Sequence, residues 1–237
     1  PPCYRVNTDL EQLDMPRLMP ENLNHMLSDI ITDHEWKILD EKMELDFSYS
    51  IPGIARYRGN VMKQRGSYAV VFRAVPYEIP QFDSLGLPAD LRDLCNLKRG
   101  LVLVTGPTGS GKSTTLAAMI DIINRSRQLN IVTVEDPIEY LHRHKKSTVR
   151  QREVGADTHS FKDALRHVLR HDPDVILIGE MRDLESISIA LTAAETGHLV
   201  FSTLHTQTAP QTINRIIDAF GESERKQIRQ QLASTIQ

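Results

Sequence analysis

Cysteines and long apolar segments are both scarce in this sequence. The 237 residues include two cysteines, Cys3 and Cys95, which stand far apart; this pattern excludes a disulfide framework and a Cys-x-x-Cys zinc site. No apolar run approaches the roughly 20 residues that a membrane-spanning helix needs, and no signal-peptide pattern opens the chain. These absences predict a cytoplasmic protein with two inert thiols.

An excess of positive charge is also missing. Lysine and arginine total 28 against 31 aspartate and glutamate residues, a formal net charge of -3 at pH 7, whereas proteins that bind nucleic acid usually carry a basic surface. The one short basic run, residues 143–146, is interpreted as a solvated turn. We therefore expect no nucleic-acid partner.

The length favours two domains, and the first is expected at 1–78. Apolar residues at helical spacing predict a helix over 20–31. Thr32 followed by Glu35 is typical of a capping box at the start of a second helix. Alternating apolar and polar residues then predict strands at 45–51, 56–62 and 67–73. The first domain is thus expected to be of the α+β class.

Prolines and a glycine interrupt the next segment, and the pattern changes after it. Pro76, Pro80, Gly86 and Pro88 predict a linker at 79–99. From 100 to 237, apolar runs alternate with amphipathic segments, which predicts an α/β domain whose parallel sheet is covered on both faces. The expected strands are 101–104, 131–134, 175–178 and 199–203, and the expected helices are 113–124, 160–171, 184–195 and 212–220.

A phosphate-binding loop is predicted between the first of these strands and the first helix. The residues fit the pattern G-x-x-x-x-G-K-[ST]. Glycines let main-chain N–H groups converge on phosphate oxygens, and the helix N-terminus favours anions. Lys112 is expected to reach the β- and γ-phosphates, and Ser113 to bind Mg²⁺; a chance match in a turn is the alternative. The expected ATP-binding residues are Gly106, Pro107, Thr108, Gly109, Ser110, Gly111, Lys112, Ser113 and Thr114.

Carboxylates follow two of the expected strands. Glu180 follows strand 175–178, and ligands of open α/β sheets bind at the carboxyl ends of strands. Glu180 is therefore the leading candidate to position an attacking water; the alternative is a helix cap. Glu135 and Glu139 follow strand 131–134, and we expect these carboxylates to surround Mg²⁺ or its waters, because they would otherwise repel each other. Spacing does not rank Glu135 and Glu139.

Two histidines, His198 and His205, flank the last expected strand. They could ligate a metal, act as acid or base, sense a ligand or cap a buried strand. A metal site is disfavoured, because they are seven residues apart across a strand with no cysteine or third histidine beside them. A role near the phosphates and a core histidine bonded to the main chain both stay open.

Together these motifs resemble the hexameric secretion ATPases that drive type II secretion, type IV pili and related machines. The phosphate loop, the acidic box 135–139, the strand that ends before Glu180 and the histidine box 196–205 occur in that family's order. The resemblance covers nearly the whole chain. It implies a RecA-like P-loop domain with a parallel sheet, preceded by a small α+β (PAS-like) N-terminal domain. It also implies that His205 senses the γ-phosphate, with His198 nearby.

Within that family the similarity is strongest to the pilus-retraction (twitching motility) ATPases. The residues that carry it are 151–154, 164–174, 179–183 and 193–198. Extension and type II secretion members usually carry a four-cysteine zinc motif, which two isolated cysteines cannot supply. The resemblance therefore favours retraction. The alternatives are an extension or secretion ATPase of the same fold and a nucleotide-binding assembly module with little turnover.

The resemblance also bears on arginines of the first domain. Arg56, Arg58 and Asn60 share one face of an expected strand. In the family, arginines of this domain approach nucleotide between subunits, where an arginine can neutralise transition-state charge. The alternative is that they are solvated surface residues. Arg73 and Arg215 are secondary candidates for the same role.

The implied protein is a Mg²⁺-dependent ATPase that forms a homo-hexamer. It would act on an inner-membrane pilus platform protein, from the cytoplasm and at the inner face of the membrane. Relative to the family, we expect the chain to lack the start of the first domain and the C-terminal helical subdomain. Two residues depart from the family pattern: Gly59, where an apolar strand residue is usual, and Gly221, where a proline is common.

Overall fold

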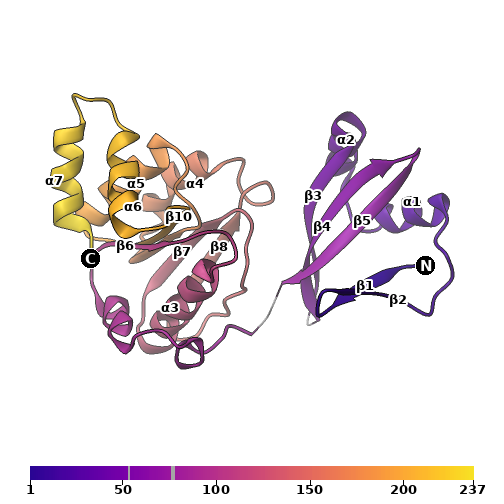
Figure 1. Cartoon of the computed structure of the whole chain (residues 1–237), viewed down its shortest axis with the longest axis horizontal. Coiled ribbons are helices and arrows are strands. Elements are labelled where there is room, and N and C mark those ends of the chain that lie inside the picture. Colours follow the sequence, from indigo (N-terminus) through magenta and orange to yellow (C-terminus); the bar gives the residue numbers. More distant parts are fainter. Residues whose placement is uncertain (53, 76–77) are drawn as a thin grey trace. The chain divides into compact units, whose positions relative to one another are not determined.

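The structure, a computed structural model, describes residues 1–52, 54–75 and 78–237 (Figure 1). The chain divides into two compact units, Pro1–Val75 and Pro76–Gln237. Each unit has its own hydrophobic core. Within the described ranges, every helix is too short or too polar to cross a membrane.

The first unit packs two helices on a three-stranded antiparallel sheet. Its elements are β1 (Cys3–Val6), β2 (Asp9–Gln12), α1 (Pro20–Ser28), α2 (Asp33–Lys42), β3 (Glu44–Ile51), β4 (Ala55–Gln64) and β5 (Ser67–Val75), with the sheet order β3-β4-β5. The Thr32 hydroxyl accepts a hydrogen bond from the Glu35 N–H (3.3 Å), and the Glu35 carboxylate accepts one from the Thr32 N–H (2.7 Å). The expected capping box is therefore confirmed.

A separate hairpin of β1 and β2 is not among the elements that the sequence predicts. All eight residues of its two strands are exposed. The sequence therefore lacks the alternation of apolar and polar residues that predicts a half-buried strand.

Gly59 makes room for an aromatic ring in the core of the first unit. It pairs with Phe47 across β3 and β4, and Phe47 is buried. A Cβ atom built on Gly59 would lie 2.3 Å from the Phe47 ring, closer than packed atoms approach. The departure from the family pattern at Gly59 thus has a steric reason. The buried residues of this core are Leu27, Ile31, Leu39, Leu45, Phe47 and Val61.

Replacing Gly59 by valine is expected to lower the free energy of unfolding of the first unit by about 1–3 kcal/mol, because the added side chain overlaps the Phe47 ring in a closed core. Thermal denaturation followed by circular dichroism measures the effect. Adding Phe47→Leu should recover part of the loss, since the smaller side chain frees space. Unchanged unfolding of Gly59→Val would contradict this packing.

The second unit is a five-stranded parallel sheet with helices on both faces (Figure 1), which confirms the predicted α/β class. The strand order is β6-β10-β9-β7-β8 for strands β6 (Gly100–Thr105), β7 (Asn130–Glu135), β8 (Thr148–Glu153), β9 (Val175–Ile178) and β10 (Leu199–Leu204). One face packs on η1 (Phe82–Leu85), η2 (Ala89–Asn96) and α3 (Lys112–Ser126). The other packs on α4 (Phe161–Val168), α5 (Leu184–Glu195), α6 (Ala209–Asp218) and α7 (Arg225–Thr235), with the short η3 (Leu169–His171) after α4.

The segment 79–99, expected as a linker, lies in the second unit and contributes to its core. Phe82 of η1 and Cys95 of η2 are buried against α3. Pro80 and Pro88 do not prevent this packing, because they lie outside the two short helices. The Arg127 guanidinium also donates hydrogen bonds to the main-chain oxygens of Cys95 (3.0 Å) and Leu97 (2.8 Å).

The two thiols differ in exposure: Cys3 is exposed and Cys95 is buried. Burial raises the pKa of the Cys95 thiol to about 11, and only the thiolate is nucleophilic. A thiol reagent at pH 8 is therefore expected to modify Cys3 in the native chain and Cys95 only after unfolding. Peptide mass mapping of the labelled sites checks this, and rapid labelling of native Cys95 would contradict the burial.

Candidate active site

Four functional segments follow four strands of the parallel sheet. The phosphate loop 106–113 follows β6, the acidic segment 136–142 follows β7, Glu180 follows β9 and His205 follows β10. Since these strands are parallel, all four segments lie at the same edge, called here the carboxyl edge. Ligands of open α/β sheets bind at this edge.

The phosphate loop has the backbone geometry of an anion cradle. Gly109 and Gly111 have φ angles of +79° and +91°, which side chains other than glycine rarely adopt. A Cβ atom at either position would meet nothing within 4 Å, so both glycines border open space. Helix α3 begins at Lys112 and directs its first N–H groups toward this space.

Lys112 bonds to main-chain oxygens of the loop itself, and Thr114 contacts the acidic segment 136–142. The Lys112 side chain is buried (9% exposed), and its Nζ donates to the main-chain oxygens of Gly106 (2.9 Å) and Pro107 (3.0 Å). The Ser113 hydroxyl belongs to an exposed residue of the first helical turn. The Thr114 hydroxyl lies 3.0 Å from the Tyr140 hydroxyl. A glycine-rich loop before a helix N-terminus, with one lysine and one exposed hydroxyl, fits a triphosphate and its Mg²⁺.

The Glu180 carboxylate is held by one cationic and one imidazole side chain. Arg182 Nε donates to Glu180 Oε2 (2.7 Å), and His205 Nε2 lies 3.3 Å from Oε1. Arg182 Nη1 also lies 3.7 Å from Asp136 Oδ2. The hydrogen bond to Glu180 raises the pKa of Arg182. With 19% of its side chain exposed, Glu180 has a fixed orientation and retains access to solvent.

Glu135 and Glu139 have different surroundings. Glu135 is buried (8% exposed), and burial raises its pKa. Its Oε1 accepts hydrogen bonds from the Thr133 hydroxyl (2.6 Å) and Gln151 Nε2 (3.1 Å). Glu139 is exposed.

The expectation that Glu135 and Glu139 surround Mg²⁺ or its waters stays a prediction. In the part of the chain that the structure describes, no three His, Cys, Asp or Glu side chains are grouped to hold a metal. The two side-chain donors to Glu135 both reach Oε1, so that oxygen is paired within the protein.

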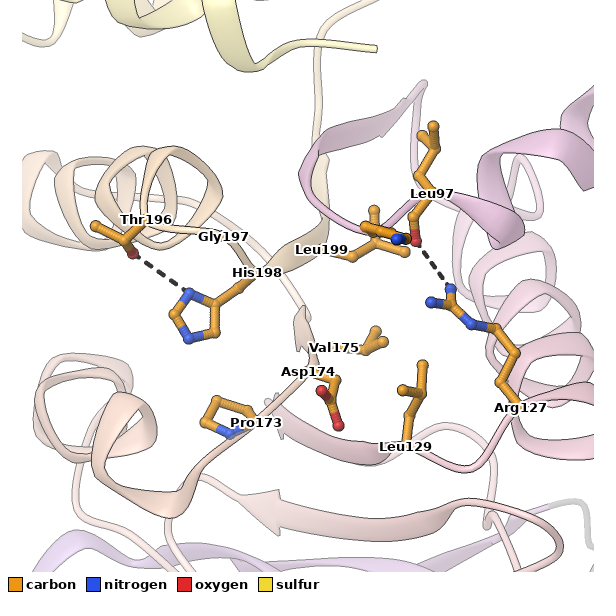
Figure 2. A pocket seen from close by; sticks show the side chains of 11 residues that line it. Leu97, Arg127, Leu129, Pro173, Asp174, Val175, Thr196, Gly197, His198 and Leu199 are labelled. Carbon is orange, nitrogen blue, oxygen red and sulfur yellow. Dashed lines mark hydrogen bonds between the residues drawn. The ribbon is translucent and has the colours of Figure 1, made fainter.

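His198 lies at the opposite, amino edge of the sheet, which corrects the expectation that it stands near His205. The two residues flank β10, whose length separates them by roughly 20 Å. His198 Nδ1 lies 2.9 Å from the Ala193 main-chain oxygen and 3.3 Å from the Thr196 hydroxyl. With Asp174 and Arg127 it lines a cavity of about 320 Å³, and Figure 2 shows these side chains around the cavity. This is the main-chain-bonded histidine that the sequence leaves open as an alternative.

The candidate arginines Arg56 and Arg58 lie on β4 of the first unit. They alternate with residues that face the core, so both belong to the face away from that core. Arg73 pairs directly with Arg58 across β4 and β5, which places it on the same face. Arg215 is exposed on α6 of the second unit. The roles of these arginines toward nucleotide stay predictions.

Three residues at the carboxyl edge are given no role by the sequence motifs. Arg182 contacts Glu180, Gln151 contacts Glu135, and Tyr140 contacts Thr114. Arg182 and Gln151 lie within segments that carry the family resemblance, and Tyr140 directly follows the acidic box. Their place in or beside the family motifs could have marked these three residues as functional. Their hydrogen-bond partners, however, can be seen only in the folded structure.

Comparison with known proteins decides the family. The family described as "Type II/IV secretion system protein" matches residues 5–237. The chain belongs to this family. The "Type IV pilus retractation ATPase PilT" of Pseudomonas aeruginosa is 48% identical over 237 residues, which are 100% of this chain and 69% of the relative. A "Twitching motility protein" of Neisseria gonorrhoeae is 46% identical over 235 residues, 99% of this chain and 63% of the relative.

The solved structures agree with these relatives. A crystal structure of the pilus retraction motor PilT with bound ADP matches with a TM-score of 0.96 at 53% identity, over 100% of this chain and 69% of that chain. The predicted resemblance to secretion ATPases, and to their pilus-retraction branch, is confirmed. The chain spans 63% to 69% of the length of the two curated relatives.

Proposed function

We propose that this chain is the ATP-hydrolysing motor of type IV pilus retraction. The observation that carries the proposal is the carboxyl edge, where the phosphate loop and the Glu180–Arg182–His205 group follow strands of one parallel sheet. The names of the relatives that match the whole chain support the same function.

Binding is assigned to the phosphate loop and the start of α3. The loop amides and Lys112 contact the phosphates, and the Ser113 hydroxyl holds Mg²⁺, which neutralises phosphate charge when bound. The Lys112 ammonium is already beside the loop, bonded to the main-chain oxygens of Gly106 and Pro107. A small rotation of its side chain exchanges these neutral acceptors for charged phosphate oxygens, which form stronger hydrogen bonds.

Hydrolysis is assigned to Glu180. Its carboxylate accepts a hydrogen bond from water and orients that water for in-line attack on the γ-phosphate. Arg182 and His205 fix the carboxylate from two sides, so little reorientation is needed before attack. His205 follows β10 at the same edge and is assigned as the sensor of the γ-phosphate.

His198 serves as a control for the proposed role of His205. His205→Ala is expected to lower kcat by about 10- to 100-fold, because the variant loses a donor beside the reacting phosphate. His198→Ala, at the amino edge, should leave kcat within about twofold of the wild type. Steady-state phosphate release measures both, and equal losses in the two variants would contradict the placement.

The motor is further proposed to assemble as a homo-hexamer in the cytoplasm, at the inner face of the membrane. There it would act on an inner-membrane pilus platform protein. Arg56 and Arg58 would approach the nucleotide of a neighbouring subunit and neutralise transition-state charge. Mass measurement with and without nucleotide tests the assembly, and a persistent monomer would contradict the shared site.

The test of the proposed activity is phosphate release against ATP concentration, with and without Mg²⁺. We expect saturable, Mg²⁺-dependent release. Binding of ATP without release would favour a nucleotide-binding assembly module instead. In cells that assemble type IV pili, deletion should leave pili that extend but do not retract. Loss of the pili themselves would favour an extension motor.

A further inference from the structure

We infer that Gln151 is a positioning residue that holds the acidic segment 136–142 against the first turn of α3. The inference rests on the proposed function, because the acidic segment and α3 border the proposed ATP site. It concerns an amide side chain on the edge strand β8, outside the residues assigned above to phosphate, Mg²⁺ or water.

The Gln151 amide makes three hydrogen bonds to one short stretch of chain. Its Nε2 donates to Glu135 Oε1 (3.1 Å) and to the Tyr140 main-chain oxygen (2.9 Å). Its Oε1 accepts from the His142 N–H (2.7 Å). Both amide protons and the carbonyl are thus used. One side chain therefore bonds Glu135, the residue before the acidic segment, and both Tyr140 and His142 at the end of the segment.

A second side chain of β8 anchors the middle of the same segment. Glu153 Oε2 accepts a hydrogen bond from the Ile138 N–H (2.9 Å), and Ile138 is buried. Gln151 and Glu153 are two residues apart, so they stand on the same face of their strand. The acidic segment is consequently bonded along its length to one face of β8.

Tyr140 transmits this placement to the phosphate loop. Its main-chain oxygen accepts from Gln151, and its hydroxyl lies 3.0 Å from the Thr114 hydroxyl. Thr114 directly follows Ser113 in the first turn of α3. A continuous path of hydrogen bonds runs from Gln151 through Tyr140 to the turn that carries Lys112 and Ser113.

The strand itself does not depend on the glutamine side chain. β8 is held to β7 by main-chain pairing over six residues, with Gln151 opposite Thr133. Loss of the amide is therefore expected to free the acidic segment and leave the sheet intact. Displacement of a reacting group by about 1 Å can reduce turnover by about 100-fold, so a loosened segment should affect kcat more than binding.

The decisive variant is Gln151→Met, which keeps the length of the side chain and removes its hydrogen bonds. We expect kcat for ATP to fall by about tenfold or more, while KM stays within about threefold of the wild type. Arg150→Gln is the matched control: Arg150 is exposed on the same strand and bonds Asn130. Wild-type kcat in Gln151→Met, or equal losses in both variants, would overturn the inference.

Tyr140→Phe tests the path without altering β8. It removes only the hydroxyl that meets Thr114, and it should lower kcat in the same direction. Its effect should be smaller in the Gln151→Met background, since both changes break one path. Additive effects of the two changes on kcat would contradict a shared path. A Tyr140→Phe variant with wild-type kcat would contradict it as well. If Gln151→Met does not fold, the Tyr140→Phe result decides the inference alone.

Amide hydrogen exchange separates this inference from the proposed function. In nucleotide-free protein, Gln151→Met should accelerate exchange of the His142 amide and leave the paired amides of β7 protected. Unchanged exchange at His142 would overturn the positioning role. Absence of turnover in the wild-type protein would instead contradict the proposed function, and the exchange data would then decide the role of Gln151.

Discussion

Lys112→Ala is expected to abolish detectable ATP hydrolysis and to weaken ATP binding by about 100-fold or more. The reason is the position of the ammonium group: it is buried beside the phosphate loop and bonded to the Gly106 and Pro107 oxygens. Removing one pre-organised donor from an oxyanion hole costs about 2.7–4 kcal/mol of transition-state stabilisation, and the loss of a charged donor to phosphate should weaken binding as well. Titration with a fluorescent ATP analogue and a phosphate-release assay measure the two losses separately.

The matched control for Lys112 is Lys226→Ala, which removes an exposed lysine of α7. It should bind and hydrolyse ATP as the wild type does. The two variants lose the same charge, so a general effect of net charge would appear in both. Unchanged turnover in Lys112→Ala would remove the enzyme assignment altogether.

Glu180→Gln is expected to lower kcat by about 100- to 10,000-fold, with ATP affinity nearly unchanged. Glutamine has the size of glutamate and keeps one acceptor for Arg182, but it has no negative charge to orient and polarise a water. The Glu180 carboxylate contacts Arg182 and His205, which lie outside the phosphate loop, so binding should survive. Single-turnover kinetics with radiolabelled ATP separate the chemical step from binding.

An exposed glutamate, Glu222, supplies the control for Glu180. Glu222→Gln should retain wild-type kcat. If Glu180→Gln retains wild-type kcat as well, water must be positioned by another group. Glu135 is then the next candidate to test, because burial raises its pKa and a raised pKa is typical of groups used in proton transfer.

The phosphate loop and the parallel sheet could be predicted from the sequence because both have strong local signals. The loop combines a fixed pattern with a flanking strand and helix, and the buried strands are short apolar runs such as 175–178. The capping box at Thr32 is equally local, since its two partners are three residues apart. Interactions of this kind depend little on the rest of the fold.

The missed elements have weak or misleading signals. Strand β8 (Thr148–Glu153) reads Thr-Val-Arg-Gln-Arg-Glu and lies at a sheet edge, so it lacks the apolar run of a central strand. Helix α7 buries only Ile228 and Leu232 among its apolar residues. In 79–99 the prolines suggested a linker, while burial of Phe82 and Cys95 depends on α3, which is distant in sequence.

The position of His198 shows that two residues of one motif need not belong to one site. His198 and His205 belong to one motif, but a strand of six residues between them carries them to opposite edges of the sheet. The expected strand 199–203 already contained that information, because a strand extends about 3.3 Å per residue. Contacts such as Gln151 with Glu135 depend on strand register, which no local pattern specifies.

The loop amides are proposed to bind the phosphates of ATP beside Glu180. A crystal structure with a non-hydrolysable ATP analogue and Mg²⁺ tests it most directly. We expect phosphate oxygens at about 2.7–3.2 Å from main-chain N–H groups of 109–113, the metal on the Ser113 hydroxyl, and Glu180 facing the γ-phosphate. An analogue bound elsewhere, with this loop free of phosphate, would contradict this placement of the ATP site.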